Sequence, residues 1–281
     1  MLRPVTFQFD KVTEWNEWRK ECIPRLKYAA RLKQIRHLPE LTPHDGNCVI
    51  VGAGPSLEQQ VDTIRQLAKG GKTFLLAVNA VHQWLIDRDI IPSAHVVFEP
   101  DIEDLSLSLG RKPHPDVVYY IASHCPPHVF KSLANYQRVL WHAYCPAQGY
   151  QNAIARYFKD EFMVAGGYCT FFRSLTIAIV LGFRDFDLFG IDSSFEDSSH
   201  LDGYKMANIE PKREVYGTNP YTGELRKFTT QGGLAYQAVE FLKFCEINQA
   251  GLKLRVHGDT LLRYLHESRY PEQYNGYQPK L

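Results

Sequence analysis

The stretch NCVIVGAGPSLEQQ, Asn47 to Gln60, begins as an apolar run and continues into a glycine-rich segment. A short apolar run of this kind is typical of a buried strand, and Pro55 followed by Ser56 is typical of a helix start. The glycines let the backbone approach a ligand closely, and the N-terminus of a helix carries partial positive charge. The stretch therefore predicts a strand, a turn and a helix start that hold a phosphate, with an ordinary tight turn as the alternative.

The same loop differs from the loops that bind nicotinamide dinucleotides. Those loops follow G-x-G-x-x-G and are completed by an acidic residue at the end of the next strand. Here Leu57 stands at the third glycine position, Pro55 lacks a backbone donor, and the next apolar run ends at Asn79. Ser56 and Gln59 instead match the S-x-x-Q pattern of a capping box. A dehydrogenase is therefore disfavoured.

Seven short apolar runs alternate with helical stretches between residues 48 and 258. They are CVIVG, TFLLAVN, AHVVFEP, DVVYYIA, RVLWHAY, DFDLFGID and LKLRVHG. Runs that are apolar throughout are typical of parallel strands covered by helices on both sides. We therefore predict a Rossmann-like α/β fold, a doubly wound and mainly parallel sheet with helices on both faces.

The N-terminal region carries a different pattern. Residues from about Thr13 to Arg36 have apolar side chains at helical spacing, and Pro24 is expected to break this helix in two. The longest irregular stretch, Met206 to Phe228, is a candidate lid or substrate loop. The predicted organisation is an N-terminal helical arm over residues 1–44, a Rossmann-like transferase domain over 45–270 and a C-terminal tail over 271–281.

Composition excludes several classes of partner. The chain has 281 residues, of which 32 are Lys or Arg and 31 are Asp or Glu, so no overall field favours nucleic acid or an anionic membrane. No apolar run approaches the roughly 18 to 20 residues of a membrane span, and the N-terminus lacks the apolar core of a signal peptide. We therefore expect a cytoplasmic protein, and its six scattered cysteines are expected to be reduced structural thiols.

Polar and small residues stand beyond the ends of the predicted strands, where ligands bind in sheets of this kind. They are Asn79, Glu99, Asp101, Ser123, His124, Gly166, Gly167, Thr170, Asp192 and His200. A histidine suits the deprotonation of an acceptor hydroxyl, and helix-terminal amides or hydroxyls suit the stabilisation of a departing phosphate.

Three of these residues are candidate catalytic groups. His200 is the first candidate base, with a loop cap or a phosphate ligand as the alternative role. His124 is the second candidate, with a plain structural turn as the alternative. Asp192 is a candidate for orienting the histidine or binding sugar hydroxyls, and helix capping is its alternative role.

In order and character these segments resemble the MptE-like superfamily. It contains archaeal 6-hydroxymethylpterin diphosphokinases and the Maf motility-associated proteins of flagellin glycosylation, and it is related to bacterial sialyltransferases that use CMP-sugars. The motifs that carry the resemblance are G-x-G-P-S-L at Gly52 to Leu57, the strand-end Asn79, Glu99 before proline, and the run that ends in Gly-Ile-Asp at Asp192. The resemblance extends from about Asn47 to His257, most of the chain.

The resemblance implies a set of nucleotide-binding residues. They are Gly52, Gly54, Pro55, Ser56, Asn79, Glu99, Gly166, Gly167 and Thr170. The C-terminal third, with SSHLDGY and a downstream Thr ahead of a long helix, looks most like the Maf branch. That likeness favours a glycosyltransferase that uses a nucleotide-activated sugar of the CMP type. The sialyltransferases place a histidine just before that helix, where this chain has FTTQGG.

Two other readings stay open. The diphosphokinase branch implies ATP-dependent transfer to a 6-hydroxymethylpterin-like substrate, with Mg²⁺ held by Asp101 together with Glu99 and Asp192. A non-catalytic nucleotide-binding module is the third hypothesis, because a fold alone does not establish activity. The expected partner is thus a small-molecule nucleotide donor, with a sugar, a protein or a pterin as the acceptor.

Overall fold

The computed structural model describes residues 18–71, 73–99, 105–159, 161–167, 169–195, 212–248 and 250–277. Within these residues the chain forms two compact units. One consists of residues 44–75 and 183–277, and the other of residues 18–43 and 76–182. These two units are defined by contacts between residues, and their limits differ from the predicted domain boundaries after residues 44 and 270. The predicted division into an arm, a transferase domain and a tail stays a prediction.

The fold is α/β and Rossmann-like, as the apolar runs predict. Each of the seven runs forms a strand, and the strands pair in parallel within each unit. These strands are β2 (Asn47–Val51), β3 (Thr73–Val78), β4 (Ala94–Val97), β5 (Val118–Ala122), β6 (Arg138–Ala143), β8 (Asp185–Phe189) and β11 (Lys253–Val256). Most of their side chains are buried, which explains why the runs are apolar throughout.

The unit of residues 18–43 and 76–182 has strands in the order β1-β6-β5-β4-β3. Two short strands that the apolar pattern missed, β1 (Arg36–His37) and β7 (Met163–Val164), both pair in parallel with β6. The helices of this unit are α1 (Trp18–Ala29), α3 (Val81–Ile86), α4 (Leu105–Leu109), α5 (Pro127–Ser132), α6 (Gln148–Phe158) and α7 (Thr170–Val180).

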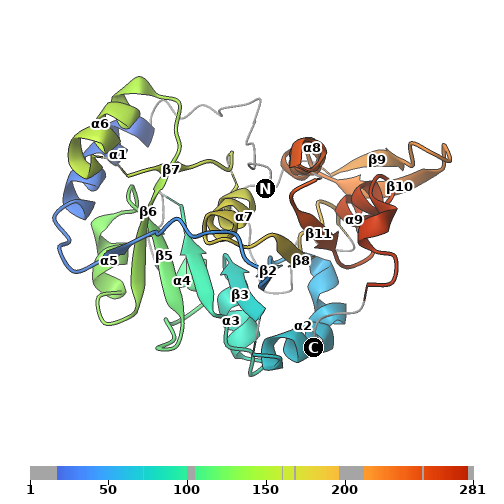
Figure 1. Cartoon of the computed structure of the whole chain (residues 1–281), viewed down its shortest axis with the longest axis horizontal. Coiled ribbons are helices and arrows are strands. Elements are labelled where there is room, and N and C mark those ends of the chain that lie inside the picture. Colours follow the sequence, from blue (N-terminus) through green and yellow to red (C-terminus); the bar gives the residue numbers. More distant parts are fainter. Residues whose placement is uncertain are drawn as a thin grey trace. The chain divides into compact units, whose positions relative to one another are not determined.

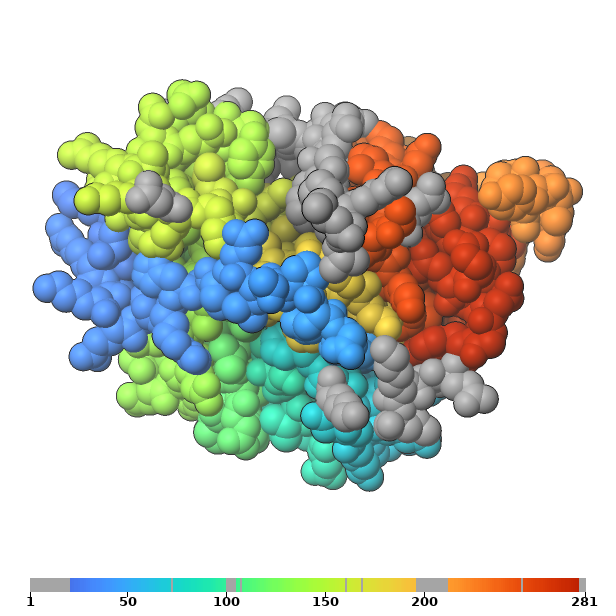
Figure 2. All heavy atoms as spheres, in the orientation of Figure 1, coloured from blue at the N-terminus to red at the C-terminus, as the bar shows by residue number. Residues whose placement is uncertain are grey.

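Helix α1 packs against α6 and α5 in this unit (Figure 1). Cys22, Leu26 and Ala29 are buried, and the blue segment that follows runs along the surface of the unit (Figure 2). The predicted break at Pro24 is wrong, because α1 continues through that residue. Proline costs a helix about 3 kcal/mol, and burial of the three apolar side chains offsets that cost. The helix ends at Ala29, earlier than the predicted Arg36, and residues 1–17 lie outside the described residues.

Helix α7 is buried on nearly all sides, since every residue from Thr170 to Ile179 is buried. Its sequence TFFRSLTIAIV is mostly apolar and has Arg173 as its single charged residue, which is the pattern of a core helix. Gly182 follows its end with a φ of 94°, a left-handed conformation that commonly terminates helices. Its first residue, Thr170, is hydrogen-bonded to Glu99, which stands two residues beyond β4, so the N-terminus of α7 lies at the carboxyl edge of this unit's sheet.

The unit of residues 44–75 and 183–277 has a parallel sheet with β8 between β2 and β11. Its helices are the 3₁₀ helix η1 (Pro55–Gln60), α2 (Val61–Lys69), α8 (Gly232–Asn248), α9 (Leu261–Glu267) and the 3₁₀ helix η2 (Pro271–Gln273). Phe186, Phe189, Phe241 and Phe244 are completely or almost completely buried in it.

The same unit contains an antiparallel hairpin of β9 (Arg213–Thr218) and β10 (Leu225–Thr230). The expectation of an irregular segment over Met206 to Phe228 is therefore wrong from Arg213 onward, and residues 206–211 lie outside the described residues. Its role as a lid or substrate loop stays a prediction. The turn is stabilised by the side-chain carbonyl of Asn219, which accepts from the amides of Tyr221 and Thr222. The sequence signal for this hairpin is the β-branched and aromatic content of REVYGT and LRKFTT on either side of the turn residues Asn219, Pro220 and Gly223.

Among the described residues, no helix combines the length and the apolar character that crossing a membrane requires. Five of the six cysteines are buried, which fits the packing role that their apolar surroundings predict.

Candidate functional site

The glycine-rich loop after β2 is tied to the segment that follows β8. Pro55 opens η1, and Gly54 is the residue before it. The Ser56 amide donates to Asp192 Oδ2 at 2.8 Å, and the Ser56 hydroxyl donates to Asp192 Oδ1 at 2.6 Å. A carboxylate thus occupies the positive end of this helix start, which is a favourable position for negative charge. Asp192 therefore lies at the loop, and its predicted catalytic role stays a prediction.

The predicted capping box is wrong. Gly54 is the N-cap, it contributes no side-chain hydrogen bond, and Ser56 is already the second residue of η1. The reason is that Asp192 arrives from a distant part of the chain and satisfies the Ser56 donors, so Gln59 is not needed as a reciprocal cap.

The glycines of this loop allow a close approach between two stretches of backbone. A Cβ on Gly54 would lie 2.6 Å from the Asp192 carboxylate, and a Cβ on Gly52 would lie 2.7 Å from the carbonyl oxygen of Gly190. The Gly52 amide donates to Phe189 and the Gly54 amide donates to Gly190, each at 2.8 Å. These amides and that of Ser56 are thus bonded within the protein, which favours the alternative of a tight structural turn for this part of the loop.

A second group of predicted residues lies at the carboxyl edge of the sheet in the unit of residues 76–182. Asn79 follows β3 directly, with a left-handed φ of 59°, and Glu99 stands two residues beyond β4. The parallel pairing of Val78 with Val96 puts both residues at the same edge. The Thr170 hydroxyl, at the first position of α7, donates to Glu99 Oε1 at 2.7 Å.

The predicted nucleotide-binding residues therefore fall into two groups. Gly52, Gly54, Pro55 and Ser56 belong to one unit together with Asp192, and Asn79, Glu99, Gly166, Gly167 and Thr170 belong to the other. Their common role in nucleotide binding stays a prediction.

Arg173 adds a buried positive charge to the second group. Its guanidinium donates to the carbonyl oxygens of Gly167 at 2.6 Å, Tyr144 at 3.0 Å and Val164. The Nε donor is buried and has no hydrogen-bond partner among the described residues. Burial lowers the pKa of Arg173 to about 10, so the group remains charged at neutral pH. Its side chain is enclosed, and its bonds are to backbone carbonyl oxygens rather than to a surface carboxylate.

His124 is completely buried, which bears on its candidacy as a base. Its Nε2 lies 2.8 Å from the carbonyl oxygen of Phe98, and its Nδ1 lies 3.5 Å from the Tyr150 hydroxyl. Burial lowers the pKa of His124 to about 3, so the ring is neutral at physiological pH. The geometry favours the structural role that the sequence left open. The other candidates, His200 as the base and Asp101 as a metal ligand, lie outside the described residues.

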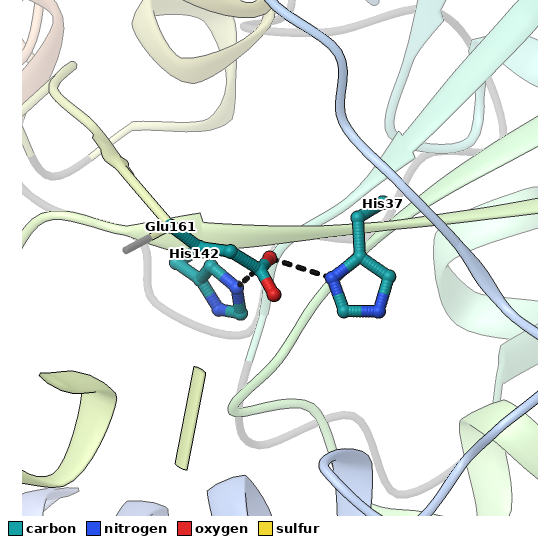
Figure 3. Close-up of side chains that lie close together, drawn as sticks. All are labelled: His37, His142 and Glu161. Carbon is teal, nitrogen blue, oxygen red and sulfur yellow. Dashed lines mark hydrogen bonds and ion pairs between the residues drawn. The ribbon is translucent and has the colours of Figure 1, made fainter. Parts of the chain in front are cut away.

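One cluster of potential metal ligands was missed by the sequence reading. His37, His142 and Glu161 converge in the unit of residues 18–43 and 76–182 (Figure 3), and their nearest ligand atoms lie within 4.8 Å of one another. The three residues are distributed over more than a hundred positions, so no spacing motif marks them. Only the pairing of β1 and β7 with β6 brings them together.

The chain is similar to proteins of known family and structure. Residues 20–198 match the family model described as MptE-like, 6-hydroxymethylpterin diphosphokinase MptE-like. The Maf glycosyltransferase from Magnetospirillum magneticum AMB-1 has a similar fold, with a TM-score of 0.59 and 15% identity over 89% of this chain and 41% of that chain. This chain thus spans about two fifths of the length of that protein.

A second solved structure is the sialyltransferase CstII from Campylobacter jejuni, in complex with the substrate analogue cytidine-5′-monophosphate. It has a TM-score of 0.37 and 15% identity, over 78% of this chain and 83% of that chain. No curated protein matches the chain significantly in sequence.

Proposed function

The chain belongs to the MptE-like family, and on that premise we propose that it is a nucleotide-dependent transferase. The finer proposal is a glycosyltransferase that takes a nucleotide-activated sugar of the CMP type. Two observations support it: the family match over residues 20–198, and a Rossmann-like fold of the kind found in the Maf glycosyltransferase.

The observation that carries the proposal is the arrangement at the N-terminus of α7. A phosphate that departs from a sugar donor needs fixed positive charge, which helix-terminal amides and a guanidinium supply. The side chain at the first position of α7, Thr170, is held by Glu99, and the buried Arg173 fixes the carbonyl of Gly167 just before the helix. In the proposal the helix start at Thr170 binds the donor phosphate, Arg173 adds positive charge nearby, and the Glu99 carboxylate orients Thr170. Asn79 at the same edge contributes to nucleotide recognition.

Asp192 takes a positioning role in this proposal. Its carboxylate already bonds to the Ser56 amide and hydroxyl, so it holds the glycine-rich loop in place while other groups bind phosphate. The base that deprotonates the acceptor hydroxyl is His200 in this proposal, on sequence grounds. We expect His200→Ala to lose sugar transfer while it retains nucleotide binding.

The main alternative is ATP-dependent diphosphoryl transfer to a pterin-like hydroxymethyl group. The description of the matching family favours it, and it requires Mg²⁺ held by oxygen ligands, with Asp101 as the candidate. The second alternative is a nucleotide-binding module without turnover. In that case no acceptor would be modified, whatever donor is bound.

A thermal-shift panel of CMP, UDP, ADP and ATP, each with and without Mg²⁺, separates these proposals. We expect CMP to raise the melting temperature by several degrees without metal, because a ligand at about 100 times its dissociation constant adds about 2.7 kcal/mol. A shift by ATP that depends on Mg²⁺ would favour the diphosphokinase instead. No shift with any of the four nucleotides would contradict nucleotide binding.

A matched pair of variants on α7 tests the proposed phosphate position. Thr170→Val removes the hydroxyl that contacts Glu99, and we expect it to abolish the CMP-induced shift. Thr176→Val, on the same helix, removes a hydroxyl that bonds only to the carbonyl oxygen of Phe172 in the preceding turn, and should leave the shift intact. Equal CMP-induced shifts of the melting temperature in both variants would show that the nucleotide does not bind at the start of α7.

A further inference from the structure

We propose that His37, His142 and Glu161 form a binding site for a divalent transition metal ion, with Zn²⁺ as the best-fitting ion. The two imidazoles point at the same carboxylate (Figure 3). His37 Nδ1 lies 2.6 Å and His142 Nε2 lies 2.9 Å from Glu161 Oε2. The inference does not depend on the proposed transferase activity.

The topology explains why the three residues meet. β5 pairs with one edge of β6, whereas β1 and β7 pair with the other edge one after the other. His37 pairs with Leu140 at the end of β1, and Met163 pairs with His142 at the start of β7. The junction between β1 and β7 thus lies beside His142, and Glu161 precedes β7 by two residues. The ligands come from three separate segments that the sheet fixes in place.

His142 is oriented as a metal-bound histidine usually is. Its side chain is 2% exposed, and its Nδ1 lies 2.9 Å from the Ser123 hydroxyl. A metal-ligating histidine generally engages its second nitrogen with a polar group, which sets the tautomer and leaves the other nitrogen free to coordinate. Without an ion, His142 Nε2–H donates to Glu161 Oε2 and Nδ1 accepts from the Ser123 hydroxyl. When an ion binds, the ring proton lies on Nδ1 and donates to the Ser123 hydroxyl oxygen, so the lone pair of Nε2 coordinates the ion. The Phe158 ring packs on His142, with ring centres 4.2 Å apart, and further restricts its rotation.

The spacing suits an ion after a small adjustment. Donor atoms around a tetrahedral zinc ion lie about 3.4 Å apart, given metal–ligand distances of about 2.1 Å. The two contacts with Glu161 are 2.6 and 2.9 Å, so the carboxylate has to move away from each nitrogen by less than about 1 Å to admit the ion. The two nitrogens lie within 4.8 Å of each other, and the half-exposed His37 ring can adjust to bring them to the spacing of an ion. Exposed fractions of 40% for the His37 side chain and 33% for Glu161 leave a path for its entry.

The ligand set also indicates which ion is favoured. Two imidazoles and one carboxylate suit Zn²⁺ and related transition metals, whereas Mg²⁺ prefers an all-oxygen shell. Three protein ligands leave a fourth position for water or for an oxygen of a substrate, as in catalytic zinc sites. The competing interpretation is a hydrogen-bonded cluster that fastens the segment after α1 to the sheet, and that cluster would bind protons only.

Metal titration of the metal-free, full-length chain tests the proposal. We expect one equivalent of Zn²⁺ by calorimetry, and one equivalent of Co²⁺ by the visible absorption of a four- or five-coordinate ion. His37→Gln and Glu161→Gln should each weaken binding by about 100-fold or more, and Ser123→Ala by about 10- to 100-fold. His44→Gln removes a histidine outside the cluster and should bind as the wild type does.

Two results would overturn the site. The first is that the wild-type protein binds both Zn²⁺ and Co²⁺ with dissociation constants above about 100 μM, which corresponds to a binding free energy of only about 5.5 kcal/mol. The other is an affinity for Zn²⁺ that His37→Gln and Glu161→Gln leave unchanged. Circular dichroism and urea unfolding of each variant check that the sheet is intact, so that a lost site is distinguished from a lost fold.

Discussion

Asp187→Asn is expected to lower the free energy of unfolding by about 3 to 5 kcal/mol at neutral pH, the cost of removing one partner from a buried ion pair. Asp187 is completely buried on β8. Its Oδ1 accepts from Arg255 Nε at 3.0 Å, His257 Nε2 at 2.8 Å and the Tyr277 hydroxyl at 2.7 Å. Its Oδ2 accepts from Asn47 Nδ2 at 3.1 Å. Asparagine keeps the shape but removes the charge and one acceptor, so buried donors lose their partner.

The control for this variant is Asp259→Asn in the same unit. Asp259 pairs with Arg226 at 2.6 Å, but its side chain is 72% exposed, and exposed pairs contribute about 0 to 1 kcal/mol. Urea unfolding of both variants and the wild type measures the difference. A cost for Asp187→Asn no larger than that of Asp259→Asn would show that the buried network contributes little to stability.

The same carboxylate gives the stability a predictable pH dependence. Burial by itself raises the pKa of Asp187, but hydrogen bonds from His257 and Arg255 outweigh it and hold the pKa well below its usual range. A depressed folded-state pKa contributes stability that is fully present above the ordinary aspartate pKa of about 4 and is lost as pH falls. We expect the wild type to lose stability below about pH 5 more steeply than Asp187→Asn does.

The strands were predictable because their signal is local. Each apolar run could be read without its neighbours, since helices cover the sheet and bury nearly every side chain of the strands. The parallel order followed from helices between consecutive runs. The two-residue strands β1 and β7 carry no such run, because their formation depends on pairing with β6 rather than on their own sequence.

The sequence does contain a signal for the charged network around Asp187. Asp185 and Asp187 lie two apart in one apolar run, and Arg255 and His257 lie two apart in another. A period of two puts each pair on one face of its strand, and charges inside buried strands need partners. The sequence could not show that the strand with the two aspartates lies beside the strand with Arg255 and His257, because that depends on the order of the strands in the sheet.

The candidate site was predictable in its location and less so in its contacts. The rule that ligands bind beyond strand ends placed the candidates Asn79 and Glu99 at one carboxyl edge, because that rule depends only on strand direction. Thr170, at the start of α7, lies at the same edge, and the binding role of all three stays a prediction. The bond between Ser56 and Asp192 joins residues 136 positions apart, and the sequence instead indicated a cap within four residues. A local sequence pattern can indicate only a partner that is near in sequence, whereas the hydrogen-bond partner of Ser56 is the distant carboxylate of Asp192.

Gly190→Ala is expected to be among the most damaging single-methyl changes in the chain. Gly190 has a φ of 62°, and a Cβ there would lie 2.3 Å from the carbonyl oxygen of Gly52 and 3.2 Å from the Gly54 amide nitrogen. The left-handed conformation costs about 1 to 2 kcal/mol for a residue with a side chain, and overpacking adds about 1 to 3 kcal/mol. Because both obstructing atoms are backbone, no side chain can move aside, and we expect a loss of about 3 kcal/mol or more.

Gly223→Ala separates the two contributions, because Gly223 has a φ of 74° in the β9–β10 turn and no atom within 4 Å of the added Cβ. It should cost only the conformational part, about 1 to 2 kcal/mol. An equal loss of unfolding free energy in both variants would mean that the loop at Gly52 yields to the methyl group. If Gly190→Ala is the more destabilising and also abolishes a CMP-induced shift that Gly223→Ala retains, then the close contact that the glycines allow serves nucleotide binding as well as packing.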